Sequence, residues 1–177
     1  MSKYIALLKG INVGGHKKVP MAELRELLSQ SGFENVRTYI QSGNVILQSS
    51  EKSNQKIEKT VKEAITNYFG FEVSVLVKTR QDLQRIFNNS PFSEDEKKTS
   101  YFIMLHNTPD KELVKIASEK IYESEAYQII EDCIYYYSAN GFGQSKFDAK
   151  FFERKLNTFA TARNYNTMLK LLSLSAD

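Results

Sequence analysis

The N-terminal half of the chain alternates between two hydrophobic periods. Apolar residues at every second position predict strands, and apolar residues three or four apart predict helices. The pattern predicts a strand, a helix, two strands, a second helix capped by Gly70, and a further strand. In chain order these elements cover residues 4–13, 20–31, 33–41, 45–48, 57–68 and 71–78. Their order is that of the ferredoxin-like βαββαβ unit.

The second half repeats this order in part. A short helix, opened by Thr79 with Asp82 completing a capping box, precedes a polar and helix-breaking segment that we expect to be a linker. Next come a strand, a helix, a hairpin, a helix that Ser145 and Asp148 cap, and a final helix. These elements cover residues 101–105, 108–117, 127–138, 145–156 and 161–172.

We therefore predict an α+β protein of two ferredoxin-like subdomains in tandem, each an antiparallel sheet with helices on one face. The subdomains should span residues 1–88 and 101–177, with a linker at 89–100. A chain of 177 residues with 41% hydrophobic content can bury cores of this size. No apolar run reaches the roughly 20 residues of a membrane helix, and the start lacks a secretory signal, so a cytoplasmic location without membrane contact is expected.

Composition argues against several chemistries. The single cysteine, Cys133, and two distant histidines, His16 and His106, cannot supply the usual zinc ligands. Cys133 sits in an apolar run and should be a buried, inert thiol. We expect no metal and no cofactor, and the sequence does not indicate an oligomeric state.

The most distinctive stretch is KGINVGGHKKVP, residues 9–20, which runs from a strand end through two glycines to the start of a helix. The formal net charge is +3, and residues 1–20 contain four lysines but no acid. Amides freed by glycine, with uncompensated positive charge at a helix N-terminus, bind anions such as phosphate. The alternative is a tight turn whose lysines are only solvated, because the spacing fits neither GxxxxGK(S/T) nor GxGxxG.

A second turn should lie beside this loop. In a βαββαβ sheet of strand order 4-1-3-2, the loop after the first strand and the hairpin between the second and third strands lie at the same end. Residues 12–18 should therefore lie near residues 41–44. The predicted ligand-binding residues in these two turns are Lys9, Asn12, Gly14, Gly15, Lys17, Lys18, Ser42, Gly43 and Asn44.

Arg163 and Asn164 are added to this set from the final predicted helix. The pattern places both residues in its first turn, where an arginine opposes the positive end of the helix dipole. A nearby carboxylate or a bound anion would account for a cation there. If this helix folds back towards the N-terminal half, Arg163 would complete the cluster around Lys9.

Three strings resemble a known family. They are LLKGINVGGHKKVPMAELRELL, VRTYIQSGNVILQS and TARNYNTMLKLL. They are similar to the bacterial family called domain of unknown function 1697, over nearly the whole chain. The resemblance implies two ferredoxin-like halves and no established activity. The chain departs from the family at Lys9, where arginine is more usual, and at Tyr165, where tryptophan is commoner. Lysine keeps the charge but loses the two-point fork of arginine.

Three classes of function remain. The first is binding of a phosphate-bearing small molecule or a nucleic-acid backbone at the glycine loop. The second is an enzyme acting on such a ligand, with His16 or a lysine as acid or base, although no catalytic residue is identified; Ser42 is a turn serine. The third is a structural or interaction protein. The tyrosines at 135–137 would either stack bases or fill the core.

Overall fold

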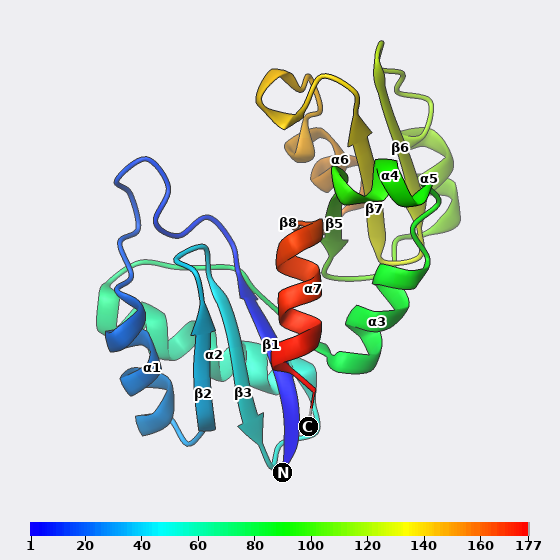
Figure 1. Ribbon diagram of the computed structural model, residues 1–177. Coiled ribbons are helices and arrows are strands. Elements are labelled where there is room, and N and C mark those ends of the chain that lie inside the picture. The colour runs from blue at the N-terminus through cyan, green and yellow to red at the C-terminus, as the bar shows by residue number, and fades with distance from the viewer. Residues whose placement is uncertain (177) are drawn as a thin grey trace. The chain divides into compact units, whose positions relative to one another are not determined.

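The computed structural model describes residues 1–176, which form two compact units (Figure 1). The first unit contains residues 1–84 and the segment from Lys170 onward, and the second contains residues 85–169. Each unit has a four-stranded antiparallel sheet with helices, so the mixed α+β class is confirmed. Within residues 1–176, no helix is both long enough and apolar enough to cross a membrane.

The sheet of the first unit has the strand order β2-β3-β1-β4, with every neighbouring pair antiparallel. Strand β1 is central, so that Ile5 faces Ile46 on one side and Lys78 on the other. This is the order from which the meeting of the two turns was predicted. The elements are β1 (Ser2–Leu8), α1 (Met21–Gln30), β2 (Glu34–Tyr39), β3 (Asn44–Ser49), α2 (Asn54–Phe69) and β4 (Val75–Thr79).

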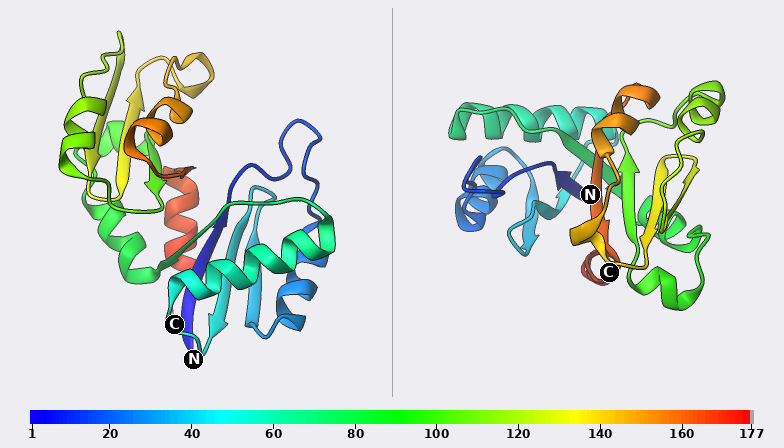
Figure 2. Two further views of the ribbon diagram at one scale, coloured as in Figure 1. Left: turned by 180° about the vertical axis from the view of Figure 1, so that it is seen from behind. Right: turned by 90° about the horizontal axis from the view of Figure 1, so that it is seen from above.

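Helices α1 and α2 cover one face of this sheet (Figure 2). In α2 the buried residues Ile57, Val61 and Ile65 recur every four positions, which places one apolar stripe against the strands. Ser53 caps the helix start, and Gly70 ends the helix in the left-handed conformation with φ 80°, as predicted. The core of the unit therefore lies between the sheet and two helices.

Strands β1 and β4 are both shorter than predicted. Strand β1 ends at Leu8, so Lys9 lies beyond the sheet and not on a strand face. The chain leaves the extended conformation at Gly10, which has φ 68°. Strand β4 begins at Val75 because its first partner is Leu8. Without a longer β1, the preceding residues have no strand to pair with.

The opposite face of the first sheet is also buried, at Ile5, Leu7, Ile46 and Leu76. Cationic side chains reach the last turn of helix α7 (Tyr165–Leu174) and the residues after it. Such a helix end carries unpaired carbonyl groups and partial negative charge, so cations stabilise it. The bonds run from Lys3 Nζ to Ala176 O (2.6 Å), from Arg37 Nη2 to Leu174 O (3.0 Å), and from Arg80 Nε to Leu172 O (3.4 Å).

The second unit contains a sheet of the same pattern, with the order β6-β7-β5-β8 and antiparallel pairs throughout. Its apolar cluster lies between the sheet and helices α5 and α6. The elements are β5 (Tyr101–Leu105), α5 (Lys111–Ala117), β6 (Glu125–Ile130), β7 (Cys133–Ser138), a 3₁₀ helix (Phe142–Gln144), α6 (Ala149–Leu156) and β8 (Ala160–Asn164). Helix α3 (Arg80–Asn88) precedes it, and α4 (Glu94–Lys98) lies within the segment expected to be a linker.

The prediction of a final helix beginning at Thr161 was wrong. Residues 160–164 form strand β8, where Arg163 pairs with Phe102 of β5, and the helix begins at Tyr165. Asn164 Oδ1 accepts a hydrogen bond from Thr167 N (2.9 Å), which is the bond expected of a residue just before a helix. The predicted place of Arg163 and Asn164 in the first helical turn is therefore corrected.

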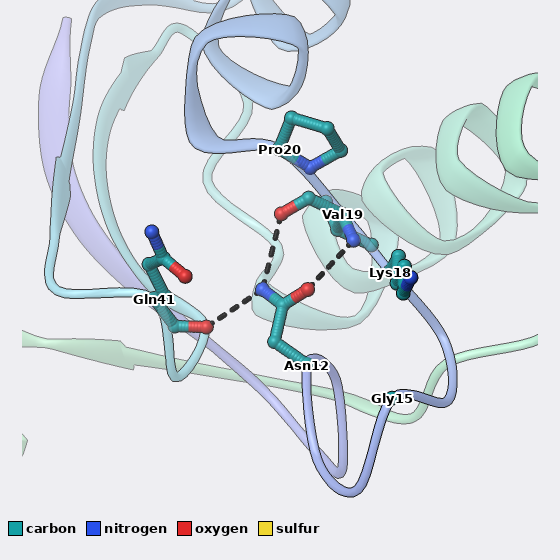
Figure 3. Close-up of a pocket in the computed structure, with 6 residues that line it drawn as sticks. All are labelled: Asn12, Gly15, Lys18, Val19, Pro20 and Gln41. Carbon is teal, nitrogen blue, oxygen red and sulfur yellow. Dashed lines mark hydrogen bonds between the residues drawn. The ribbon is translucent and has the colours of Figure 1, made fainter.

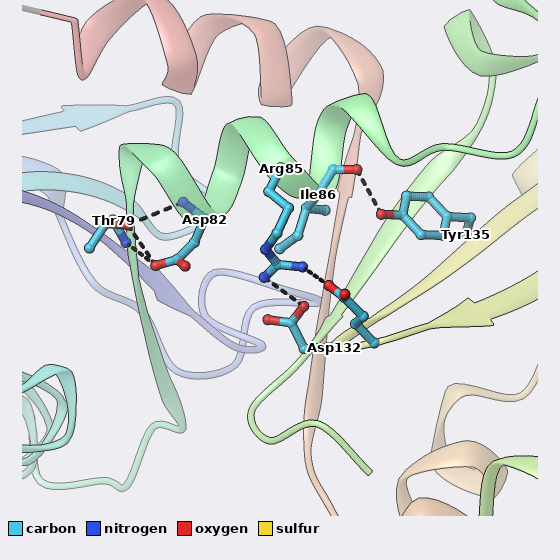
Figure 4. Close-up of polar contacts among 7 residues, drawn as sticks. Thr79, Asp82, Arg85, Ile86, Asp132 and Tyr135 are labelled. Carbon is cyan, nitrogen blue, oxygen red and sulfur yellow. Dashed lines mark hydrogen bonds and ion pairs between the residues drawn. The ribbon is translucent and has the colours of Figure 1, made fainter. Parts of the chain in front are cut away.

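The prediction that helix α6 begins at Ser145, with Asp148 completing the capping box, was also wrong. Asp148 itself precedes the helix and accepts a hydrogen bond from Phe151 N (3.2 Å). Ser145 lies outside the helix, where its hydroxyl accepts from Tyr136 (2.6 Å). The cap predicted for α3 is confirmed, because Thr79 N donates to Asp82 (2.9 Å) and Asp82 N donates back to the Thr79 hydroxyl (3.1 Å) (Figure 4).

Tyr135 and Tyr136 fill the core of the second unit, whereas Tyr137 is only partly buried. Tyr135 and Tyr136 are each 1% exposed, so neither ring is accessible for base stacking. The Tyr135 hydroxyl donates to Ile86 O (2.7 Å), and burial raises its pKa well above the ordinary value. Nearby, Arg85 pairs with Asp132 (2.9 Å) and with Glu131 (Figure 4). Cys133 is buried, as predicted.

The contacts at the end of α7 lead to a stability prediction. Arg37→Ala should lower the free energy of unfolding by about 1 kcal/mol, because one charged hydrogen bond to a helix-end carbonyl is lost. Urea unfolding measures the change. Lys52→Ala, at an exposed lysine of the same unit, is the control and should change stability by less than about 0.5 kcal/mol. Equal losses in both variants would contradict the prediction.

Candidate functional site

The loop between β1 and α1 is tightly turned and closed on itself. Asn12 N donates to Lys17 O (3.1 Å), and His16 N donates to Val13 O (3.0 Å). At its base, Lys9 N donates to Ser74 O (3.0 Å). Left-handed φ values recur along it, which glycine and asparagine tolerate best. They occur at Gly10 (68°), Asn12 (55°), Gly14 (57°), Gly15 (76°) and Lys17 (47°).

The Asn12 side chain fastens this loop to the β2–β3 hairpin (Figure 3). Its Oδ1 accepts from Val19 N (2.8 Å), and its Nδ2 donates to Val19 O (3.0 Å) and to Gln41 O (2.8 Å). The side-chain amide pairs with Val19 as a backbone strand would. The predicted meeting of the two turns at one end of the sheet is thus confirmed.

Gly43 allows the hairpin to approach the end of β1. Leu8 N donates to Gly43 O (2.8 Å). A Cβ atom at position 43 would lie 2.7 Å from Leu8 Cβ and 2.9 Å from Leu8 O, distances that require the backbone to move. Gly43 also has φ 84°, a conformation that other residues adopt only with strain. Glycine is therefore required here on two counts.

The rest of the hairpin turn is shaped from within. Asn44 is fully buried, and its Nδ2 donates to Tyr39 O (3.1 Å) and to the Ser42 hydroxyl (3.0 Å). Ile40 has φ 49°, which is strained for a β-branched side chain. Its side chain is about half exposed, so packing of that side chain does not explain the strained backbone. The polar groups of Asn44 thus hold the turn that presents Gln41 to the loop.

A pocket of about 400 Å³ lies where the loop meets the hairpin (Figure 3). It borders Pro20, the residue before α1, which offers no side-chain hydrogen bond to the first turn. The acid of that turn, Glu23, accepts a hydrogen bond from the Tyr68 hydroxyl (3.3 Å) and raises the pKa of Tyr68. We call this cavity the Pro20 pocket; its lining residues are Asn12, Gly15, Lys18, Val19, Pro20 and Gln41.

A second pocket, of about 340 Å³, takes its lining from the same loop and from α2 and the residues after it. Lys17 contributes to this pocket whereas Lys18 contributes to the Pro20 pocket, so consecutive lysines line different cavities. Sequence analysis missed Lys62 and Glu72, because neither belongs to a motif. We call this cavity the lysine pocket; its lining residues are Lys9, Gly10, Lys17, Lys62, Glu72, Val73 and Ser74.

The predicted site residues are thus divided. Ser42, Gly43 and Asn44 form the hairpin turn and do not line either pocket, and neither does the exposed loop residue Gly14. Arg163 belongs to the second unit, where it is 7% exposed and Nη1 donates to the Thr161 hydroxyl (2.8 Å) and to a backbone carbonyl. Burial lowers the pKa of Arg163 to about 10.

His16 is exposed and lines neither pocket, so it is not placed to transfer a proton to a ligand in either one. In residues 1–176, no group of three or more histidine, cysteine, aspartate or glutamate side chains is arranged to hold a metal ion. The polar groups that line the two pockets are backbone groups, the side-chain amides of Asn12 and Gln41, lysine ammonium groups, the Glu72 carboxylate and the Ser74 hydroxyl.

A family model described as "Protein of unknown function (DUF1697)" matches residues 1–135. The chain belongs to the DUF1697 family. The matched range includes the loop, the hairpin and every residue that lines the two pockets. No curated protein matched the sequence. Among solved structures, the chain is similar to conserved bacterial protein SP0830 from Streptococcus pneumoniae, at 25% identity, 99% coverage of both chains and a TM-score of 0.78. The DUF1697 resemblance is confirmed over residues 1–135, which include the first two of the three strings; the third, at residues 161–172, lies outside the matched range.

The contact at Gly43 leads to the second prediction. Gly43→Ala should lower the free energy of unfolding by at least about 3 kcal/mol, because left-handed strain and a backbone clash add together. Gly70→Ala is a matched control, since φ is 80° there and a Cβ would meet nothing within 4 Å. That variant should lose only about 1 kcal/mol. Urea unfolding of both variants measures the two losses of unfolding free energy. Because both positions have a left-handed φ, the difference between the two losses reports the clash with Leu8.

Asn12 gives a third prediction, with a dependence on pH. Asn12→Asp should lower the free energy of unfolding by about 2–3 kcal/mol at neutral pH, because a carboxylate would face two carbonyl oxygens. Burial against carbonyl groups would raise the pKa of the new carboxyl, so the loss should shrink as the pH falls and the acid becomes a donor. Asn35→Asp, at an exposed amide that donates to Gln48 (2.7 Å), is the control. A loss independent of pH would contradict this account.

Proposed function

We propose that this DUF1697 chain binds a phosphate-bearing small molecule or a nucleic-acid backbone at the Pro20 pocket. The observation that carries the proposal is that the pocket borders a helix N-terminus that no side chain caps. The first backbone N–H groups of a helix have no acceptor within the helix, and the positive end of the helix dipole favours an anion. A phosphate oxygen satisfies both.

We assign a different role in binding to each of three lining residues. Gly15 has no side chain, and a Cβ built there would meet nothing within 4 Å, so a ligand can approach the backbone closely. Lys18 is the one charged residue among the lining residues and supplies attraction. Asn12 uses its amide to hold the loop against Gln41, so its part is to position the loop. Ser42, Gly43 and Asn44 form the hairpin turn that positions Gln41 and do not contact the ligand in this proposal.

We also infer that each unit is ferredoxin-like, supported by the order of strands and helices in both. The domain limits 1–88 and 101–177 and a cytoplasmic location remain proposals from the sequence. An enzymatic role with His16 as acid or base has weaker support, because His16 lies outside both pockets. The alternative, a lysine as acid or base, remains a proposal.

The test is a titration of the protein with inorganic phosphate, in which the chemical shifts of the backbone amides are measured at each phosphate concentration. We expect saturable shifts at Gly15, Met21 and Ala22, and about a two- to fivefold weaker affinity in Lys18→Ala, as for the loss of one exposed charge. Lys52→Ala should leave the affinity unchanged. Shifts spread evenly over the surface, without saturation, would contradict the proposal.

A parallel titration separates the two ligand classes. Affinity for a single-stranded oligonucleotide should fall steeply as salt rises if the backbone is the ligand, because bound counterions are released. Affinity for a small phosphate ester should change less. Saturable thermal stabilisation by the ester alone would favour the small-molecule class.

A further inference from the structure

The lysine pocket brings together cations from separate parts of the chain. Lys9 and Lys17 come from the two sides of the glycine loop, and Lys62 comes from α2. Surface lysines on a convex face point apart into solvent, whereas these three border one cavity of about 340 Å³. We propose that this pocket is a second anion site, for the doubly charged phosphate group of a phosphomonoester.

Glu72 organises two of the three lysines. Its backbone carbonyl accepts a hydrogen bond from Lys17 Nζ (2.8 Å), and its carboxylate lies 3.5 Å from Lys62 Nζ. The two ammonium groups are thus held near one residue at the rim. Because the Glu72 side chain is 76% exposed and that of Lys62 is 45% exposed, an entering anion can compete with the carboxylate for Lys62.

The charge balance selects the class of ligand. The lining residues include three lysines and one glutamate, so their formal charge sums to +2. A phosphomonoester carries close to two negative charges at neutral pH, because its second pKa is about 6, whereas a phosphodiester carries only one. Lysine ammonium groups act as mobile point charges and suit a compact tetrahedral anion better than a planar group that needs an arginine fork.

The backbone beside the lysines is accessible. Gly10 lines the pocket with φ 68°, and a Cβ built on it would meet nothing within 4 Å. A phosphate oxygen can therefore approach the main chain there without displacing a side chain. The lysine pocket shares no lining residue with the Pro20 pocket, so the inference stands apart from the proposed function.

The experiment uses the intact chain and methyl phosphate, inorganic phosphate and dimethyl phosphate as probes, with calorimetry and amide shifts of Gly10 and Ser74 as readouts. Lys62→Ala should weaken methyl phosphate binding about fivefold. Glu72→Gln should tighten it about threefold, because it removes the competing carboxylate and keeps the backbone carbonyl that holds Lys17. Dimethyl phosphate, with a single charge, should bind at least tenfold more weakly than methyl phosphate.

The control is Lys59→Ala, on the same helix, where Lys59 pairs with Glu63 (3.8 Å) and does not line this pocket. It makes the same charge change and should leave affinity unchanged. The proposal requires opposite shifts in Lys62→Ala and Glu72→Gln, so the absence of either shift overturns it. Binding lost in Lys18→Ala but kept in Lys62→Ala would support the Pro20 pocket alone, and the reverse would support the lysine pocket alone.

Discussion

The arrangement at the top of the first sheet depends on one side-chain amide. Asn12 replaces a peptide group, since it pairs with both backbone atoms of Val19 and at the same time reaches the carbonyl of Gln41. Without this link, the glycine loop would be held only by its own short turns and by the bonds of Lys9 and Lys17 to residues 72–74. Because the loop is fixed, Lys17 and Lys18 line different cavities, and the start of α1 stays next to the hairpin. A local hydrogen-bond pattern thus positions the loop that carries Lys17 and Lys18.

Much of the first unit could be predicted from the sequence because its signals are local. The hydrophobic periods marked the strands and helices, Gly70 marked a helix end, and the order of elements was enough to bring the loop to the hairpin. Residues that depend on distant partners were not predicted. Strand β8 is an example, because the sequence at Ala160–Asn164 has no strong strand pattern and is extended only through its pairing with β5.

The candidate site shows the same division. Glycines, lysines and amides of the loop stand together in the sequence and could be chosen as a group. Their separate roles could not be seen there, because Asn12 and Asn44 use their amides inside the protein, and only the folded chain shows which lysine enters which cavity. Lys62 and Glu72 lie on other elements and carry no motif, so no local signal could have found them.

The return of the segment from Lys170 to the first unit has a consequence for biosynthesis. Lys3, Arg37 and Arg80 bind carbonyl groups of residues 172–176, which leave the ribosome long after the first sheet has been translated. During elongation, the three cations therefore cannot form these bonds until all of residues 85–169 have been synthesised. Its folding can begin on the nascent chain, but it can be completed only after the second unit has been synthesised.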